Sequence, residues 1–248
     1  MSRNEAYGEW FHAGRQDGAA RSAERVLPLV FDLVRPACVV DVGCGTGAWL
    51  AAAQRLGAET ILGIDGGRVA EDARHIPPDG FLARDLAHPL RLDGRRFDLA
   101  VCMEVAQQLD PVRADSLVGD LCTLSDVVLF SAAIPGQTGT GHRNEQWPNY
   151  WRDRFGQWGY ALVDCLRARL WDDPEIEPRY AQNAYLYVGA DRLAADGRLR
   201  AAAAETGRMP LCVVHPGLPA LSPKPFAPPV PAPPEQRRAP QRYLPHPR

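Results

Sequence analysis

Residues 39–50, VVDVGCGTGAWL, decide the fold of this chain. An apolar run reaches Asp41, and three glycines, Gly43, Gly45 and Gly47, follow within a few positions. Glycine adopts backbone conformations that other residues avoid, at an entropic cost, so glycines clustered behind a strand indicate a tight turn or a ligand close to the backbone. The stretch therefore predicts a buried strand, a turn and the start of a helix.

Short apolar runs typical of buried strands alternate with helical patterns between residues 20 and 190. Apolar residues recur at helical spacing over residues 23–34, 48–58 and 113–124. The alternation predicts an α/β fold with a doubly wound, mostly parallel, seven-stranded sheet covered by helices. The expected strands are Cys38–Val42, Ile61–Asp65, Gly80–Ala83, Leu99–Cys102, Val127–Ser131, Tyr160–Val163 and Tyr185–Val188.

The glycine loop is expected at the carboxyl edge of this sheet, beside a helix N-terminus, where ligands bind. Gly43-x-Gly45-x-x-Ala48 fits a relaxed dinucleotide fingerprint, so a nicotinamide-dependent oxidoreductase is one alternative. A phosphate-binding P-loop is excluded, because it requires Gly-Lys-Ser or Gly-Lys-Thr and no lysine or arginine occurs over residues 39–54. Asp65 ends the next strand 20 residues after Gly45, a spacing that brings a carboxylate to a ribose.

Residues 41–47, DVGCGTG, resemble the first motif of class I S-adenosylmethionine-dependent methyltransferases, and the resemblance extends over most of residues 20–190. It implies a Rossmann-like methyltransferase fold with S-adenosyl-L-methionine as cofactor. In that family the glycine loop passes the methionine part of the cofactor. An acidic residue after the second strand binds the ribose, and one after the third strand lies near the adenine. Residues 97–109, FDLAVCMEVAQQL, are similar to the family's fourth strand and its exit. The cofactor-binding residues implied by the resemblance are Ser22, Asp41, Gly43, Cys44, Gly45, Gly47, Asp65, Gly66, Asp85, Leu86, Met103 and Glu104.

Three of these residues also have a purely structural alternative. Asp41 is then a capping or turn residue, Asp85 a solvated helix cap and Ser22 a helix N-cap. By the resemblance, Arg21 and Ser22 instead lie near the methionine carboxylate of the cofactor. Residues 1–35 then form a lid or the first helices over the cofactor.

Residues 131–151, SAAIPGQTGTGHRNEQWPNYW, follow a buried strand and combine small residues with many polar and aromatic ones. Such density is more than a connector needs and is typical of a substrate-binding loop. The segment resembles a PGQ-G-GH-NEQWP-YW signature of a subgroup of bacterial small-molecule methyltransferases, in which the next helix opens at the proline. That subgroup also shows a later W-D-D and Y-x-Q-N, matched here by residues 171–173 and 180–183.

His142 and Glu145 are the candidate catalytic residues of this segment. Neutral imidazole titrates near physiological pH, so His142 suits a general base that removes a proton from the acceptor. Glu145 would orient His142 or contact the acceptor. The alternative is that both residues only pin the loop to the following helix. Trp147, Tyr150 and Trp151 either line an acceptor pocket or pack that helix against the sheet.

One departure from the family concerns residues 104–108. Relatives often have E-V-A-E-H there, whereas this chain has EVAQQ, with Gln108 in place of the histidine. If that histidine is the base in relatives, its role has moved to His142 or has been lost, which keeps a non-catalytic methyltransferase-like scaffold open. A metal-assisted mechanism would use Glu104, Asp110, His142 and Glu145, but no ligand spacing compels it, and no metal is predicted.

Composition changes sharply near the end of the chain. From Met209 onward the sequence contains 13 of the 23 prolines, which favour extended conformations and lack the periodicity of a core. The predicted organisation is therefore an N-terminal lid or first helices over residues 1–35, a methyltransferase domain over 36–206 and a proline-rich flexible tail over 207–248. The tail is either a disordered appendage or a segment that docks on a partner or on the catalytic domain.

Charge and cysteine content restrict the partners. Lys and Arg total 28 against 30 Asp and Glu, without a basic run, so no nucleic-acid partner is expected. Six cysteines without a C-x-x-C pair indicate reduced thiols in the cytoplasm. No signal peptide or membrane-spanning run is visible, so no membrane partner is expected. The predicted function is methyl transfer to a hydroxyl or amine of a small molecule, a natural product or sugar-like metabolite. The alternative acceptor is a peptide or protein.

Overall fold

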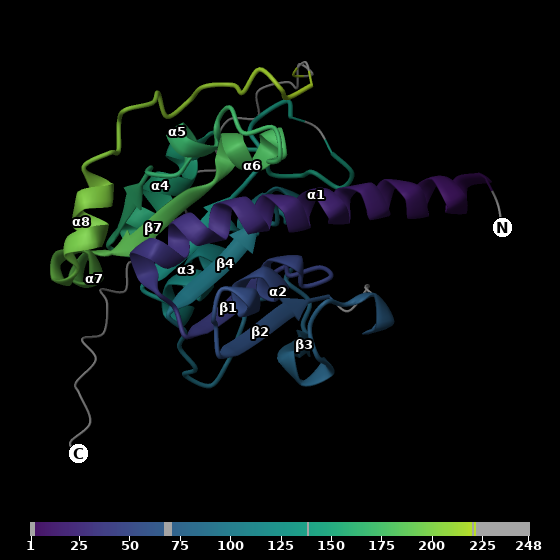
Figure 1. Cartoon of the computed structure of the whole chain (residues 1–248), viewed down its shortest axis with the longest axis horizontal. Coiled ribbons are helices and arrows are strands. Elements are labelled where there is room, and N and C mark those ends of the chain that lie inside the picture. Colours follow the sequence, from purple (N-terminus) through teal and green to yellow (C-terminus); the bar gives the residue numbers. More distant parts are fainter. Residues whose placement is uncertain (1–2, 67–70, 138, 220, 222–248) are drawn as a thin grey trace.

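A computed structural model describes residues 3–66, 71–137, 139–219 and 221, with side chains described from Gly18 onward. Seven strands form one sheet in the order β3-β2-β1-β4-β5-β7-β6, with helices on both faces (Figure 1). Their bounds are β1 Cys38–Val42, β2 Thr60–Asp65, β3 Phe81–Ala83, β4 Leu99–Met103, β5 Val127–Ser131, β6 Tyr160–Val163 and β7 Tyr185–Gly189.

The five strands from β3 to β5 run parallel, and β7 is antiparallel to both of its neighbours. The predicted α/β fold with a mostly parallel seven-stranded sheet is therefore confirmed. Strands β1, β5 and β6 have the predicted bounds, and the others differ by one residue at one end. The apolar runs alone placed these strands because both faces of the sheet are covered.

Two apolar cores lie on opposite faces of the sheet. Successive residues of a strand point to opposite faces, so Val39 of β1 joins the core that contains helix α1, while Val40 joins the core that contains helix α3. The principal helices that cover the sheet are α1 Arg3–Val34, α2 Ala48–Arg55, α3 Ala114–Leu124, α4 Pro148–Gln157 and α8 Gly197–Ala203. No helix of the described chain is both long and apolar enough to cross a membrane.

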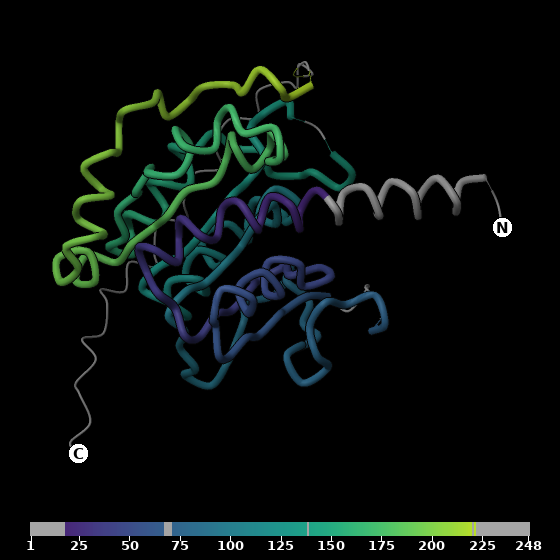
Figure 2. Tube along the Cα trace, viewed as in Figure 1, coloured from purple at the N-terminus to yellow at the C-terminus, as the bar shows by residue number. Residues whose placement is uncertain are grey.

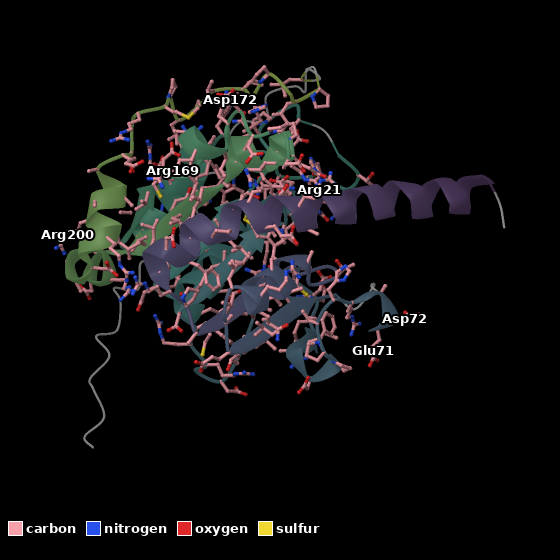
Figure 3. All side chains as sticks on the ribbon, viewed as in Figure 1. Arg21, Glu71, Asp72, Arg169, Asp172 and Arg200 are labelled. Carbon is pink, nitrogen blue, oxygen red and sulfur yellow. The ribbon has the colours of Figure 1, made fainter. Side chains whose placement is uncertain are left out.

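The N-terminal region forms one long helix. Helix α1 begins at Arg3, well before the predicted start of a helix at residue 23, and continues through Pro28. Ser22 therefore lies inside a helix, and its alternative role as an N-cap is wrong. Its fully buried hydroxyl oxygen accepts a hydrogen bond from the Glu177 backbone N–H (3.0 Å). Arg21, beside it, is exposed on α1 (Figure 3).

The segment after α8 lies against the domain. Residues 209–218, here called the strap, run across the outside of the short helices α5 Arg167–Leu170 and α6 Pro178–Asn183 (Figure 2). Backbone groups of the strap are hydrogen-bonded to side chains of both helices. The strap therefore agrees with the alternative that the tail docks on the catalytic domain, while residues 222–248 lie outside the described chain.

Candidate active site

The glycine loop joins β1 to α2 through three left-handed residues. Gly43, Gly45 and Gly47 have φ angles of +86°, +53° and +81°, which side chains disfavour. A Cβ on Gly43 would lie 2.2 Å from Cγ2 of Val105, and one on Gly47 would lie 2.8 Å from Cγ2 of Ile76. A Cβ on Gly45 would meet nothing within 4 Å among the described residues. The first and third glycines therefore permit close packing, whereas the backbone at the second is open to a ligand.

Asp41 lies within β1 and is 1% exposed, so its alternative role as a capping or turn residue is wrong. Burial, reinforced by the nearby Asp65, raises the pKa of its carboxyl well above the usual range. Within the described residues its Oδ2 is buried without a hydrogen-bond partner. A buried carboxylate of this kind favours a cationic partner, which would compensate its lost hydration.

Asp65 is at the end of β2, beside the glycine loop, as its spacing predicted. Its Oδ2 accepts a hydrogen bond from the Gly45 N–H (2.9 Å), and its Oδ1 accepts one from the Gly66 N–H (2.6 Å). The carboxylate therefore braces the loop from the neighbouring strand. Its side chain is partly exposed, so it is also accessible from the edge of the sheet.

Asp85 and Leu86 follow the third strand of the chain, β3. The Asp85 side chain is 71% exposed, accepts a hydrogen bond from the Ala87 N–H (2.9 Å) and lies 3.8 Å from Nε2 of His88. It thus caps a solvated turn, and no helix begins there. The Leu86 carbonyl accepts a hydrogen bond from Nε of Arg113 (3.1 Å). Contact of either residue with an adenine stays a prediction.

The exit of β4 carries Met103 and Glu104. Met103 is buried, and Glu104 has a φ of +59°, an uncommon conformation for a residue with a side chain. The Glu104 N–H donates to both the carbonyl and the hydroxyl oxygen of Ser131 (3.1 and 2.9 Å). Nε2 of Gln107 donates to Oε2 of Glu104 (3.1 Å). These contacts fix the turn at the edge of the sheet.

Helix α6 lies at the same edge of the sheet as this turn, because it ends just before Tyr185, which pairs with Phe130 near the end of β5. Burial raises the pKa of Tyr180, and the carboxylates of Glu104 and Glu177 add to this shift while the Arg179 guanidinium opposes it. The ring of Tyr180 also packs edge-on against Trp49 in the first turn of α2, with centroids 5.2 Å apart. Helix α6 therefore links the β4 exit to the helix that follows the glycine loop.

His142 and Glu145 form a buried pair in the loop after β5. Nδ1 of His142 lies 2.8 Å from Oε1 of Glu145, and the two side chains are 6% and 4% exposed. Oε2 of Glu145 accepts a hydrogen bond from the Gly136 N–H (2.9 Å). A Cβ on Gly139 would lie 2.3 Å from Nε2 of His142, so a side chain there would cover that nitrogen. The pair both anchors the loop and has the geometry of a base with an orienting carboxylate.

The family of the chain follows from comparison with known proteins. Residues 11–169 match a family model described as a methyltransferase domain. The chain belongs to this family. It is an S-adenosylmethionine-dependent methyltransferase.

Solved structures are similar to the methyltransferase in fold. DesVI from Streptomyces venezuelae superposes with a TM-score of 0.54 and 16% identity, over 77% of this chain and all of DesVI. The sugar N-methyltransferase KedS8 from Streptoalloteichus also has a TM-score of 0.54, with 18% identity over 73% of this chain and 92% of KedS8. No curated protein matches the chain in sequence.

The residues at the glycine loop fit this cofactor. The open backbone at Gly45 admits a close approach, and the unpartnered Oδ2 of Asp41 suits the ammonium group of a methionine. The cofactor has no phosphate, which agrees with a loop without lysine or arginine. Binding by the individual residues from Ser22 to Glu104 stays a prediction.

The backbone of Gln107 binds the loop around His142 to the turn after β4. The backbone carbonyl of Gln107 accepts from the backbone N–H groups of Arg143 and Asn144 (2.7 and 3.0 Å). Within the loop, Nε2 of Gln146 donates to Oδ1 of Asn144 (2.9 Å). Gln107 and Asn144 are buried, yet Oε1 of the first and Nδ2 of the second have no hydrogen-bond partner among the described residues. The loop thus has polar groups available for a ligand or an ordered water.

Gln108 occupies the position at which a histidine was expected, and its amide is turned toward solvent. Nε2 donates to the Glu104 carbonyl (3.1 Å). Gln108 lines an open cavity of about 300 Å³ together with Asp110, Arg113 and Arg143. The described side chains contain no group of three or more His, Cys, Asp or Glu arranged to hold a metal ion, so the four alternative ligands are not gathered into one site.

The aromatic residues of the segment have separate roles. Trp151 is 2% exposed and packs against Phe130, with ring centroids 5.1 Å apart, so the packing alternative is confirmed for it. Helix α4 begins at Pro148, as the signature implied. Tyr150 lies beside Trp151 and faces the Arg154 guanidinium, which is 3.4 Å from its ring centroid.

Two features of the site were missed from sequence. Gly63 in β2 lies under the glycine loop, where a Cβ would be 2.7 Å from Sγ of Cys44, and the apolar run around it gave no sign of this contact. Gln182 and Asn183 in α6 are buried and hydrogen-bonded to distant segments. The Y-x-Q-N match was the available signal for α6, but it did not indicate what the side chains contact.

Proposed function

We propose that this methyltransferase methylates a hydroxyl or amine of a small molecule, a natural product or sugar-like metabolite, with His142 as general base. The buried His142–Glu145 pair carries the proposal. KedS8, which shares the fold, is a sugar N-methyltransferase by its description, and this supports the same class of acceptor. Identity at this level is too low for the neighbour alone to assign a substrate.

The cofactor supplies an electrophilic methyl group when bound. Asp41, Gly45 and Asp65 would hold and orient it at the edge of the sheet. Glu145 accepts a hydrogen bond from Nδ1–H of His142, which leaves the lone pair of Nε2 to accept a proton from the acceptor. A general base of this kind contributes about 10²–10⁴-fold to the rate. Low exposure of both side chains keeps water from the proton-accepting nitrogen.

Neutral amides favour a neutral, hydroxyl-rich acceptor. Gln107, Asn144 and Asn183 are each at most 2% exposed, and each has one polar atom without a hydrogen-bond partner among the described residues. These atoms comprise one N–H donor and two carbonyl acceptors. Hydroxyl groups can bind both kinds, because a hydroxyl both donates and accepts hydrogen bonds.

Thiols and charge support the remaining parts of the proposal. All six cysteines are free, which agrees with a protein of the reducing cytoplasm. The net charge of −2 is spread without a basic run and supports an acceptor other than nucleic acid.

The proposal is tested by incubating the full-length protein with isotopically labelled S-adenosylmethionine and fractionated small metabolites. Mass spectrometry should find a labelled methyl group on a hydroxyl or amine of a small molecule, and the His142→Gln variant should not produce it. Label on peptides alone, or equal product from the variant, would contradict the assignment.

A further inference from the structure

Two clusters of contacts hold the strap on the domain. In the first, the fully buried Arg167 of α5 forms an ion pair with Asp164, from Nε to Oδ1 at 3.0 Å. Its Nη2 donates to the Pro210 carbonyl (3.0 Å), and its guanidinium lies over the ring of Tyr185. The hydroxyl of Tyr185 donates to the Leu211 carbonyl (3.4 Å). This cluster secures the start of the strap to the sheet.

The second cluster connects the strap to α6. Nε2 of Gln182 donates to the Val213 carbonyl, and Oε1 of Gln182 accepts from the His215 N–H, both at 2.5 Å. The His215 ring packs against Trp171, with Nε2 2.6 Å from the Trp171 carbonyl. Both ends of the Gln182 amide are therefore used by the strap. The side chain is fully buried, so loss of the strap would leave two unsatisfied polar groups.

The opposite contacts of α6 lead to both halves of the active site. Nδ2 of Asn183 donates to Oε1 of Gln137 (3.0 Å), which also accepts from the Ile134 N–H (3.1 Å) at the start of the His142 loop. Tyr180 packs on Trp49 of α2, next to the glycine loop. One short helix thus joins the strap, the His142 loop and the cofactor side.

A helix as short as α6 cannot fix its own position. It contains six residues, and isolated helices below about 12–15 residues are marginal in water. Its placement must therefore come from its tertiary contacts, and the Gln182 amide supplies two of them. A shift of α6 would move Asn183 and Tyr180 together, and with them the anchors of the acceptor loop and of α2.

We propose that the strap is a positioning element of the methyltransferase, which sets the acceptor loop by holding α6 through Gln182. The inference deepens the proposed function and rests on it for the identity of the acceptor loop. Gln182 touches neither reactant and acts through Asn183 and Gln137. If the strap only added stability, removing its contact with α6 would leave the hydrogen–deuterium exchange of residues 131–147 unchanged.

The test compares two full-length variants, Gln182→Ala and Thr206→Ala. The control removes a hydrogen bond just before the strap, where the Thr206 hydroxyl oxygen accepts (3.0 Å) from the N–H of Asp164, a residue outside α6. Hydrogen–deuterium exchange is measured by mass spectrometry on peptides covering residues 131–147 and 178–183. We expect Gln182→Ala to accelerate exchange in both regions by roughly tenfold or more, since local opening free energies set the exchange rate. Thr206→Ala should leave both unchanged.

Kinetics on the methylated acceptor give the second readout. Gln182→Ala should raise KM for the acceptor roughly tenfold, the effect of about one lost buried hydrogen bond, with a smaller change in kcat. Gln182→Glu, which still accepts from the His215 N–H, should recover part of the loss. Equal exchange and equal KM in both alanine variants would overturn the positioning role.

Failure of the proposed function would give a different experimental result from failure of the positioning role. If the wild-type protein methylates no small molecule, the assignment of the acceptor fails, but exchange in residues 131–147 still reports whether the strap orders the loop. If Gln182→Ala is unfolded by circular dichroism, Gln182→Glu takes its place in the exchange experiment. Unchanged exchange in that variant would then overturn the proposal.

Discussion

The proposed cofactor side and the proposed acceptor side of this methyltransferase are built in different ways. On the cofactor side, contacts between adjacent strands and one loop place Asp41, Gly45 and Asp65 within a stretch of 25 residues. On the acceptor side, the His142 loop depends on Gln107 and on Asn183, residues far from it along the chain. A common donor can be held by a local motif, whereas a particular acceptor calls for contacts assembled from distant segments.

The largest expected effect is a loss of kcat without a loss of cofactor affinity, on substitution of His142. His142→Gln should lower kcat by about 10²–10⁴-fold, because the base is lost, while the affinity for S-adenosylmethionine stays at the wild-type value. Steady-state kinetics and calorimetry measure the two quantities. A variant with undiminished kcat would show that the pair only anchors the loop.

The next largest effect concerns the buried ion pair behind the strap. Asp164→Ala leaves the Arg167 guanidinium buried without its counter-charge and should lower the free energy of unfolding by about 3–5 kcal/mol. The matched control is Asp126→Ala, which removes the exposed ion pair with Arg96 and should cost at most about 1 kcal/mol. Urea unfolding measures both. Similar losses in the two variants would show that burial of the Asp164–Arg167 pair contributes little to the free energy of unfolding.

On the cofactor side, alanine substitutions at two glycines distinguish the cost of backbone strain from the cost of a packing collision. Gly43→Ala combines a φ of +86° with a collision against Val105 and should cost about 2–4 kcal/mol. Gly57→Ala has a φ of +103° but no neighbour within 4 Å, so about 1–2 kcal/mol of strain is expected. Thermal unfolding should therefore rank Gly43→Ala as the less stable variant, and the reverse order would contradict the packing shown for the loop.

The smallest effect is a pH dependence from Asp41. Burial raises its pKa in the folded protein, so above the ordinary pKa of Asp the unfolded chain has lost a proton that the folded chain still holds. Stability attributable to Asp41 therefore falls as pH rises through this window, by at most about 1.4 kcal/mol per pH unit. Asp41→Asn should flatten the pH profile of unfolding measured above pH 4. An unchanged profile would show that Asp41 is ionised in the folded protein.

Sequence reasoning succeeded where the determinants were local. The strands, the glycine loop and the place of Asp65 followed from apolar runs and from a spacing of 20 residues. The pairing of His142 with Glu145 was also proposed from the sequence, because residues three apart in a tight loop readily meet.

Other features depend on contacts that no local pattern reports. The prolines of the strap indicate an extended chain but do not decide between a free tail and one that docks on the domain. The sequence does not show that Arg167 and Gln182 satisfy its carbonyls. Ser22 was considered as an N-cap because the polar residues before it obscure the helical pattern, although α1 continues through them. The hydroxyl of Ser22 instead accepts from Glu177, more than 150 residues away.

The most direct test of the central claim measures the affinity of the full-length protein for S-adenosylmethionine by isothermal titration calorimetry, together with the Asp65→Ala and His142→Gln variants. The account predicts that the wild type and His142→Gln bind the cofactor equally well and that Asp65→Ala binds it far more weakly. Equal binding by Asp65→Ala, or loss of binding in His142→Gln, would contradict the separation of a donor side from an acceptor side.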